Sequence, residues 1–167
     1  MNEGLDERIT TFCERLAALD SGGRAHLKRC AGRPLAASLE ALGLFYRLLP
    51  PGVPAWQEET YFLLATLYPL ADAGDTGNLG AALLRARSPQ NERGLDRRFE
   101  MLLDADEGQL PFRLRQTVRF LQSNRVPVCW PQLLRDLLGW NHPERYVQKA
   151  WARAYYAPVP ETTPAEG

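Results

Sequence analysis

The stretch from Asn141 to Tyr156, NHPERYVQKAWARAYY, has the spacing of an amphipathic α-helix. Asn141 or His142 suits the cap, and Pro143 suits the first helical position, where its missing N–H is not needed. Apolar residues then recur every three or four positions, as expected for one buried face: Val147, Ala150, Trp151, Ala154 and Tyr155. We therefore predict a final helix that starts near Pro143 and packs one face into a core.

The same stretch carries three cations, each four residues from the last: Arg145, Lys149 and Arg153. Residues four apart lie one above another on a helix, so these side chains form a positive stripe, with Tyr156 close behind. A core face together with a positive face suits binding to a polyanion. A solvated amphipathic helix without a partner is the alternative, and the stripe alone leaves both interpretations open.

Upstream of this stretch, the apolar residues again follow helical spacing, and no segment has the alternation of a convincing strand. The break at residues 20–23, DSGG, can cap a following helix through Asp20. Residues Leu35–Leu49 are predicted to form one continuous helix that ends at Pro50-Pro51. We expect an all-α fold of about nine helices and no sheet.

The domain organisation is predicted from turn-forming residues. Ser88-Pro89-Gln90-Asn91 is the best boundary candidate, because such clusters separate periodic segments. We expect two small helical bundles, residues 1–90 and 91–157. Residues 158–167 lack core-forming side chains and are predicted to be a disordered tail.

The charges balance overall, but they are segregated along the chain. The 167 residues carry 20 basic and 20 acidic side chains, so the formal net charge is zero. Residues 51–80 contain no Lys or Arg, whereas basic residues gather at 24–33, 85–98, 113–135 and 145–153. Such segregation can give one positive face on a molecule without net charge.

Residues of catalytic or metal-binding type are few and lack recognisable spacing. His26 and Cys30 are four apart, but a structural zinc site needs four ligands at short spacings. Gly74, Gly77 and Gly80 precede a predicted helix without the strand of a P-loop or dinucleotide site, so that helix start could hold one phosphate at most. We therefore expect no enzyme activity, no metal and no cofactor.

The cysteines and the hydropathy indicate a cytoplasmic protein. Cys13, Cys30 and Cys129 are widely spaced and form no C-x-x-C pair, which is typical of reduced thiols. The N-terminus has no apolar run of signal-peptide type, and no stretch is long and apolar enough to cross a membrane. We expect no membrane contact.

A repeated basic stripe is the strongest functional signal. It occurs on several predicted helices: Arg24, Lys28 and Arg29; Arg93, Arg97 and Arg98; Arg115 and Arg119; and Arg145, Lys149 and Arg153. Contacts from these side chains to phosphates would bind nucleic acid without reading its sequence, and the affinity would fall steeply with salt. Trp140, Tyr155 and Tyr156 offer stacking to unpaired bases, with core packing as the alternative for each.

The order of six motifs resembles the CasB family, the small subunit of the type I-E CRISPR surveillance complex, Cascade. The motifs are LDSGGRAHLKR (19–29), FYRLLP (45–50), NLGAALLRAR (78–87), NERGLDRRFEMLLDAD (91–106), CWPQLLRDLLGW (129–140) and RYVQKAWARAYY (145–156). Each motif is weak alone, but their number and order span nearly the whole chain. The resemblance implies an all-helical, non-catalytic protein, present as two copies head to tail beside the other Cascade subunits.

The resemblance also implies basic surfaces that help to hold the hybrid of CRISPR RNA and target DNA and the displaced non-target strand. In such complexes base pairing reads the sequence, while the protein holds the backbone. The basic positions within matching motifs are Lys28, Arg29, Arg97 and Arg98, together with Arg115 and Arg119 in a further matching stretch, LRQTVRFLQ (114–122). The remaining candidates depend on helical spacing: Arg24, Arg145, Lys149 and Arg153.

A helical scaffold without direct nucleic-acid contact is the second hypothesis. Its basic faces would meet acidic faces of partner proteins or of a second copy. Salt-sensitive affinity for single-stranded DNA separates the two hypotheses, because only phosphate binding releases counterions from DNA. An enzyme is the third hypothesis, weakened by the lack of convergent titratable groups.

Overall fold

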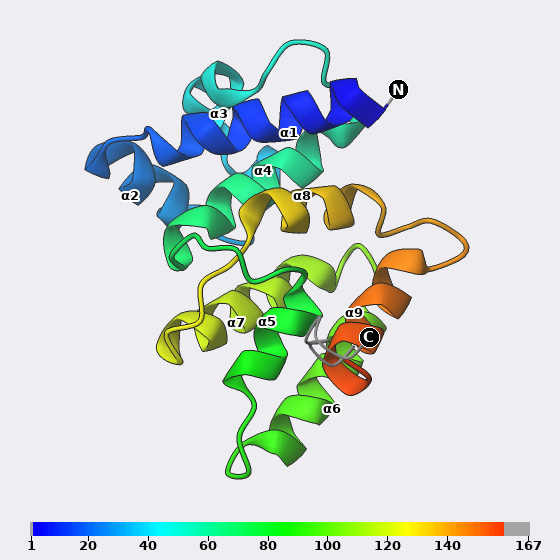
Figure 1. Ribbon diagram of the computed structural model, residues 1–167. Coiled ribbons are helices and arrows are strands. Elements are labelled where there is room, and N and C mark those ends of the chain that lie inside the picture. Colours follow the sequence, from blue (N-terminus) through cyan, green and yellow to red (C-terminus); the bar gives the residue numbers. More distant parts are fainter. Residues whose placement is uncertain (1, 159–167) are drawn as a thin grey trace, which may run out of the picture.

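The computed structural model describes residues 2–158, with side chains from residue 3 onward (Figure 1). Nine α-helices lie within these residues: α1 (Asn2–Ala17), α2 (Ser21–Arg29), α3 (Leu42–Leu48), α4 (Glu58–Leu67), α5 (Leu79–Ala86), α6 (Glu92–Leu103), α7 (Leu110–Ser123), α8 (Trp130–Leu138) and α9 (Tyr146–Tyr156). Four short 3-10 helices accompany them: η1 (Leu35–Ala37), η2 (Leu39–Ala41), η3 (Ala55–Gln57) and η4 (Tyr68–Leu70).

The all-α prediction is confirmed. The described residues contain no sheet, and their β-type pairing is limited to one isolated bridge between Ala73 and Val128. The predicted disordered tail, residues 158–167, lies outside the described residues apart from Pro158.

Two helix starts lie where the sequence encodes a cap. The Asp20 side chain accepts a hydrogen bond from the backbone N–H of Gly23 at 2.7 Å, at the start of α2. Asn78 accepts in the same way from Ala81 N at 3.0 Å, at the start of α5. Each cap satisfies an N–H group that has no partner inside the helix.

The predicted helix over Leu35–Leu49 is wrong as a continuous element, because η1, η2 and α3 replace it. Ser38, between η1 and η2, has φ −134° and ψ 41°, outside the helical region. Its hydroxyl donates to the carbonyl oxygen of Pro34 at 3.0 Å. A serine side chain that bonds to nearby backbone competes with the backbone hydrogen bonds of a helix. The segment with helical leucine spacing therefore forms short helical turns and not one helix.

The final helix, α9, begins at Tyr146 instead of near Pro143. Arg145 precedes it with a left-handed backbone, φ 53°, which costs a non-glycine residue about 1–2 kcal/mol. Its guanidinium donates to the carbonyl oxygens of Trp140 at 3.3 Å and Leu103 at 3.5 Å. These two bonds, of which the one to Leu103 is long-range, offset the backbone cost, and the local preference of proline for a helix start does not decide where α9 begins.

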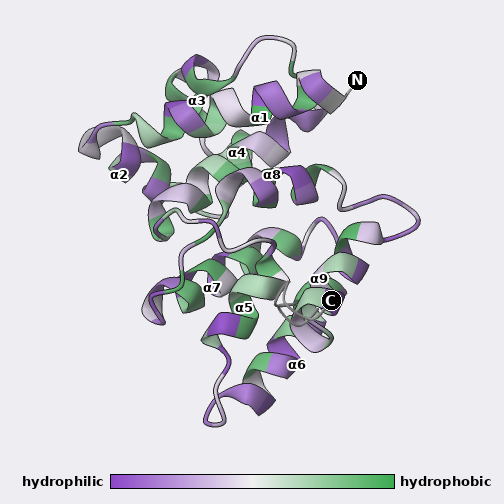
Figure 2. Ribbon diagram, in the orientation of Figure 1, coloured by the Kyte–Doolittle hydropathy of each residue, from purple (hydrophilic) through white to green (hydrophobic). Residues whose placement is uncertain are grey.

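The helices form two groups, one above the other in Figure 1. The upper group contains α1, α2, α3, α4 and α8, and the lower group contains α5, α6, α7 and α9. Helix α4 is buried on most sides and packs against α2, α7 and α8. Figure 2 shows hydrophilic and hydrophobic residues mixed along α1 and α6, as expected of helices that cover the core from outside.

One hydrophobic core runs through both groups. Helix α5 packs closely on α9, and α8 packs on α1 and α4, so contacts join segments from both sides of Ser88–Asn91. The division into units 1–90 and 91–157 stays a prediction.

A buried carboxylate joins α8 to α9. Asp136 is 9% exposed, and it accepts hydrogen bonds from Trp151 Nε1 at 2.8 Å and Gln132 Nε2 at 2.9 Å. Burial raises the pKa of Asp136, and the two hydrogen bonds oppose that rise. Asp136 thereby holds the last helix in place through a specific polar contact inside an apolar core.

Candidate nucleic-acid interface

Helix α2 presents its predicted cations to solvent. Leu27 and Cys30 are buried in the core, whereas Arg24, Lys28 and Arg29 are exposed. The Arg24 guanidinium donates to the Ala17 carbonyl oxygen at 3.4 Å and lies 5.8 Å from the centre of the Tyr68 ring. Arg24 is therefore held against the protein, whereas Lys28 and Arg29 make no ion pair within the described residues.

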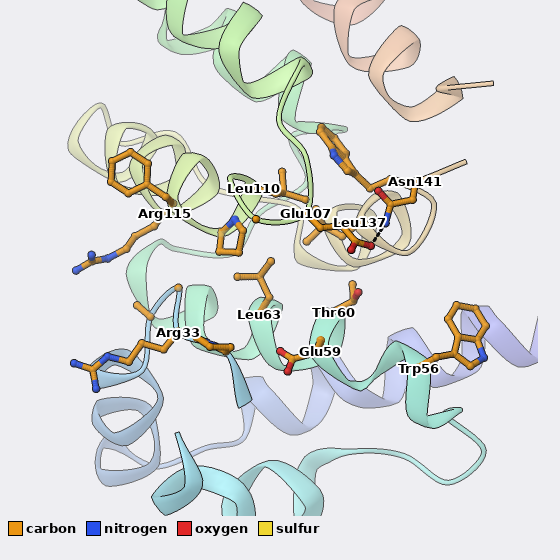
Figure 3. A pocket seen from close by; sticks show the side chains of 17 residues that line it. Arg33, Trp56, Glu59, Thr60, Leu63, Glu107, Leu110, Arg115, Leu137 and Asn141 are labelled. Atoms are coloured by element: carbon orange, nitrogen blue, oxygen red, sulfur yellow. Dashed lines mark hydrogen bonds between the residues drawn. The ribbon is translucent and has the colours of Figure 1, made fainter. Parts of the chain in front are cut away.

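Helix α7 brings two more predicted cations beside the end of α2. A Cβ added to Gly32, in the turn after α2, would lie 3.5 Å from Cδ of Arg115. Figure 3 shows Arg33 and Arg115 pointing to the same side from facing elements. Arg119 is exposed one turn further along α7. We call this set the α2–α7 basic face: Lys28, Arg29, Arg33, Arg115 and Arg119.

Arg97 and Arg98 are exposed on α6, next to α7. The Arg98 guanidinium lies 4.9 Å from the centre of the Phe120 ring, within the range of a cation–π contact. The ring holds the side chain of Arg98 without neutralising its charge. Helix α6 therefore adds two cations beside α7, and these do not belong to the α2–α7 basic face.

An ion-pair cluster fixes α6 relative to α5 and α9. Arg87 Nε donates to Asp96 Oδ1 at 2.9 Å, and the Tyr155 hydroxyl donates to the same carboxylate. The hydrogen bond from Arg87 lowers the pKa of Asp96. Burial, followed by the bond to Asp96, raises the pKa of Tyr155. Asp96 thus serves packing, and it does not neutralise its neighbours on α6.

The basic stripe of α9 is shorter than predicted. Lys149 and Arg153 are exposed, but Arg145 is half-buried before the helix and bound to carbonyl oxygens, so it does not continue the stripe. In Figure 1, α9 and α2 lie at opposite sides of the molecule. The α9 stripe therefore lies apart from the cations at the end of α2.

The predicted stacking residues are mostly internal. Trp140 and Tyr155 are 1% and 3% exposed, and both belong to the core. Tyr156 is 49% exposed at the end of α9. The core alternative is therefore correct for Trp140 and Tyr155.

None of the predicted cations forms an ion pair within the described residues. The ion pairs found there join Arg87 to Glu92 and to Asp96, and Arg135 to Asp6. A guanidinium without a carboxylate partner retains its charge and its fork of donors for an external anion. The ion pairs of the described residues thus involve arginines other than the predicted cations.

A groove of about 660 Å³ lies between the two helix groups (Figure 3). Arg33 and Arg115 flank one end, and Trp56, which is 77% exposed, lies at the other. Its remaining side chains include Phe112, which is 56% exposed, with Glu59 and Glu107. The groove therefore combines an aromatic and apolar lining with cations at one end and carboxylates inside.

The start of α5, where the glycine spacing allowed one phosphate at most, is capped by a side chain and packs on α9. Asn78 caps the helix and donates through Nδ2 to the Ala150 carbonyl oxygen at 3.3 Å. A Cβ added to Gly80 would lie 2.8 Å from the carbonyl carbon of Trp151. Backbone atoms of α9 therefore lie against the first turn of α5.

Other chemistry is sparse in the part of the chain that the structure describes. It holds no group of three or more His, Cys, Asp or Glu placed to bind a metal ion. The cysteines are free, and burial raises the pKa of Cys13 to about 12. None of the described helices combines the length and hydropathy needed to span a bilayer.

Arg33 and Phe112 were not singled out from the sequence. Arg33 falls in the basic stretch 24–33, but its local signal was only that it precedes Pro34 and ends a helix. Phenylalanine is usually a core residue, but Phe112 is exposed beside Arg115. Only the packing of α7 on the turn after α2 brings these side chains together.

The similarity to known proteins extends over most of the described helices. The model of the family described as CRISPR-associated protein Cse2 matches residues 23–156. The Cse2 protein of Thermus thermophilus is 36% identical over 157 residues, which cover 90% of this chain and 89% of that protein.

Solved structures agree with these sequence matches. The crystal structure of a Cse2-family protein from Thermus thermophilus has a TM-score of 0.77 at 33% identity, covering 90% of this chain and 97% of that one. The crystal structure of M. ruber CasB has a TM-score of 0.75 at 30% identity, covering 91% and 94%. A chain in a structure described as a CRISPR RNA-guided surveillance complex shares the fold, with a TM-score of 0.75 at 20% identity, covering 90% and 92%.

The family model covers most of the described residues, and the Thermus relative is similar over nearly the full length of both chains. The predicted resemblance to CasB is thereby confirmed. The chain belongs to the CRISPR-associated Cse2 family, which includes the CasB proteins.

Proposed function

We propose that this chain is a non-catalytic subunit of a CRISPR RNA-guided surveillance complex of the type I-E Cascade kind. Its partners are the other Cascade subunits, a second copy of itself, the CRISPR RNA, and the target and non-target DNA strands. Its role is to hold the RNA–DNA hybrid and the displaced strand through phosphate contacts in the cytoplasm.

The α2–α7 basic face carries this proposal. Its five cations come from two helices and one turn, and none of them forms an ion pair within the described residues. Without a direct carboxylate partner, each guanidinium or ammonium group keeps its donors available for a phosphate. Family membership supports the proposal, and a chain of the same fold occurs in a CRISPR RNA-guided surveillance complex.

Phosphate contacts fit the division of labour in guided DNA recognition. Watson–Crick pairing with the guide supplies sequence specificity, so the protein needs only to hold the backbone and the displaced strand. Arg and Lys side chains on helices bind phosphates irrespective of the bases. The proposed role therefore requires no catalytic group.

A salt titration tests the proposal. The chain is assembled into its complex, and binding to target DNA and to single-stranded DNA is measured over a range of salt. The double variant Lys28→Ala with Arg29→Ala should weaken binding and reduce the slope of log K against log salt by about 1.4 for single strands, at about 0.7 per lost phosphate contact.

The matched control removes two exposed cations outside the proposed faces, Arg47→Ala with Arg85→Ala. It has the same change in net charge, so it should leave the slope near that of the parent. Equal slopes for the parent and for the Lys28/Arg29 variant would contradict phosphate binding by the α2–α7 basic face.

A protein–protein scaffold is the second candidate function. Leu39 and Trp56 are 66% and 77% exposed, and large exposed apolar side chains are typical of interaction surfaces. Trp56 also lies within the segment 51–80, which contains no Lys or Arg. A pure scaffold would show no salt-sensitive affinity for single-stranded DNA, while Trp56→Ala would reduce its incorporation into the complex.

A further inference from the structure

The groove between the helix groups has features that a uniform phosphate track does not need. Arg33 and Arg115 lie at one end of it, and Glu59 and Glu107 lie inside. Carboxylates repel a phosphodiester backbone, so a strand cannot run through the whole groove. The arrangement suits a ligand that is negative at one end and carries neutral N–H donors at the other.

We propose that this groove is a subsite for one unpaired nucleotide, with the base inside and its phosphate on Arg33 and Arg115. The inference rests on the proposed function, and it adds a site for a base to the phosphate contacts. The volume of about 660 Å³ lies within the range of about 300–1,000 Å³ usual for small-ligand sites.

The phosphate end is built from two guanidinium groups on facing elements. Arg33 follows the turn after α2, and Arg115 lies on α7 beside Gly32. Nε of Arg115 is buried and has no hydrogen-bond partner within the described residues. Neither arginine forms an ion pair there. Two such forks can hold one phosphate from two directions.

Phe112 supplies the stacking surface. It lies three residues before Arg115, so the two side chains are neighbours on α7. The ring is 56% exposed and lines the groove, and the Arg113 guanidinium lies 5.7 Å from its centre. The exposed part of the ring offers a flat apolar surface on which a base could stack.

The carboxylates give the base edge its acceptors. Glu59 Oε2 accepts from the backbone N–H of Leu35 at 3.3 Å, and Glu107 Oε1 accepts from the side chain of Asn141. Each carboxylate has a second oxygen that can accept from the exocyclic amino group of a base. Hydrogen bonds from the base to these carboxylates would orient the nucleotide with its phosphate at the arginine end.

The test compares an ordinary single-stranded DNA with a strand of equal length made of abasic nucleotides. Binding of both to the full chain is measured at fixed salt, and then over a range of salt. The parent should prefer the ordinary strand by at least about five-fold, since stacking of one base contributes about 1–3 kcal/mol. A 2-aminopurine in the ordinary strand should lose fluorescence when bound.

Phe112→Ala should abolish the preference without changing affinity for the abasic strand. Tyr46→Ala, which removes another half-exposed ring outside the groove, should leave the preference intact. Arg33→Ala should weaken both strands alike, because it removes a phosphate contact. Arg33 is exposed, so its replacement leaves the core unchanged.

The outcomes separate this inference from the proposed function. Salt-sensitive binding with equal affinity for both strands would overturn the base subsite alone. The same holds if Phe112→Ala weakens both strands equally. Absence of salt-sensitive binding to either strand would overturn both proposals. If Phe112→Ala leaves DNA binding intact but prevents incorporation into the complex, the groove binds a protein segment and the subsite is wrong.

Discussion

Replacing Gly80 by alanine should destabilise the protein, although alanine favours helices. Gly80 is buried in the first turn of α5, where α5 packs on α9. An added Cβ would lie 2.8 Å from the carbonyl carbon of Trp151 and closer still to its oxygen. That neighbour is backbone, so it cannot turn aside as a flexible side chain would.

Two opposing terms set the magnitude. Alanine gains up to about 1 kcal/mol over glycine from helix propensity. Overpacking costs about 1–3 kcal/mol or more when neighbours must shift. Here α9 would have to move away, which disturbs the Asn78 bond to Ala150 and the buried contact between Trp151 and Asp136. The packing term should win, with a net loss of about 1–2 kcal/mol.

Gly94→Ala is the matched control, because Gly94 also lies in the first turn of a helix, α6, and an added Cβ would meet nothing within 4 Å. It should keep or raise the free energy of unfolding. Urea titration and thermal melting of both variants measure the difference, at about 2–4 °C in Tm for each kcal/mol. If Gly80→Ala is as stable as Gly94→Ala, the inferred close approach of α5 and α9 is wrong.

Three further changes probe individual polar contacts. Because burial raises the pKa of Asp136, the native state binds its proton more tightly than the unfolded chain does, and the stability from this group falls as pH rises through the raised value. Asp136→Asn should remove that fall in urea titrations from about pH 3 to about pH 7. Arg87 lowers the pKa of Asp96 in the folded state. The stability from the Arg87–Asp96 interaction is therefore present above the pKa of Asp96 in the unfolded chain, and it is lost as pH falls through the lowered pKa of the folded state. Arg87→Gln should therefore lower Tm at neutral pH, and the gap from the parent should close in strong acid. Asp20→Ala removes the cap bond to Gly23 and should cost about 1 kcal/mol in the free energy of unfolding, with Asp20→Asn as the variant that keeps the cap.

Local features of the sequence were enough to find most helices. Periodic apolar residues and caps act within a few residues, so the start of α2 at Asp20 is encoded where it is observed. The motifs that resemble CasB also predicted the family and its all-α fold correctly. Charge segregation along the chain indicated one positive face, which stays a prediction.

Local preference failed where distant contacts were stronger. Arg145 is bonded to Leu103 on α6, and this fixes the start of α9 three residues beyond Pro143. Ser38 interrupts a leucine pattern that would otherwise form one helix. A sequence pattern describes one segment of the chain, and it carries no information on contacts with residues from other segments.

The sequence by itself determined that the protein is helical and which family it resembles. Only the tertiary structure decided which basic faces adjoin one another: it brings Arg33 beside Arg115 and places the α9 stripe on another side. The physical reason is the distance along the chain between the residues that interact. Helix spacing follows from backbone bonds between residues four apart, whereas the rotation and contact of whole helices follow from packing between side chains far apart in the chain.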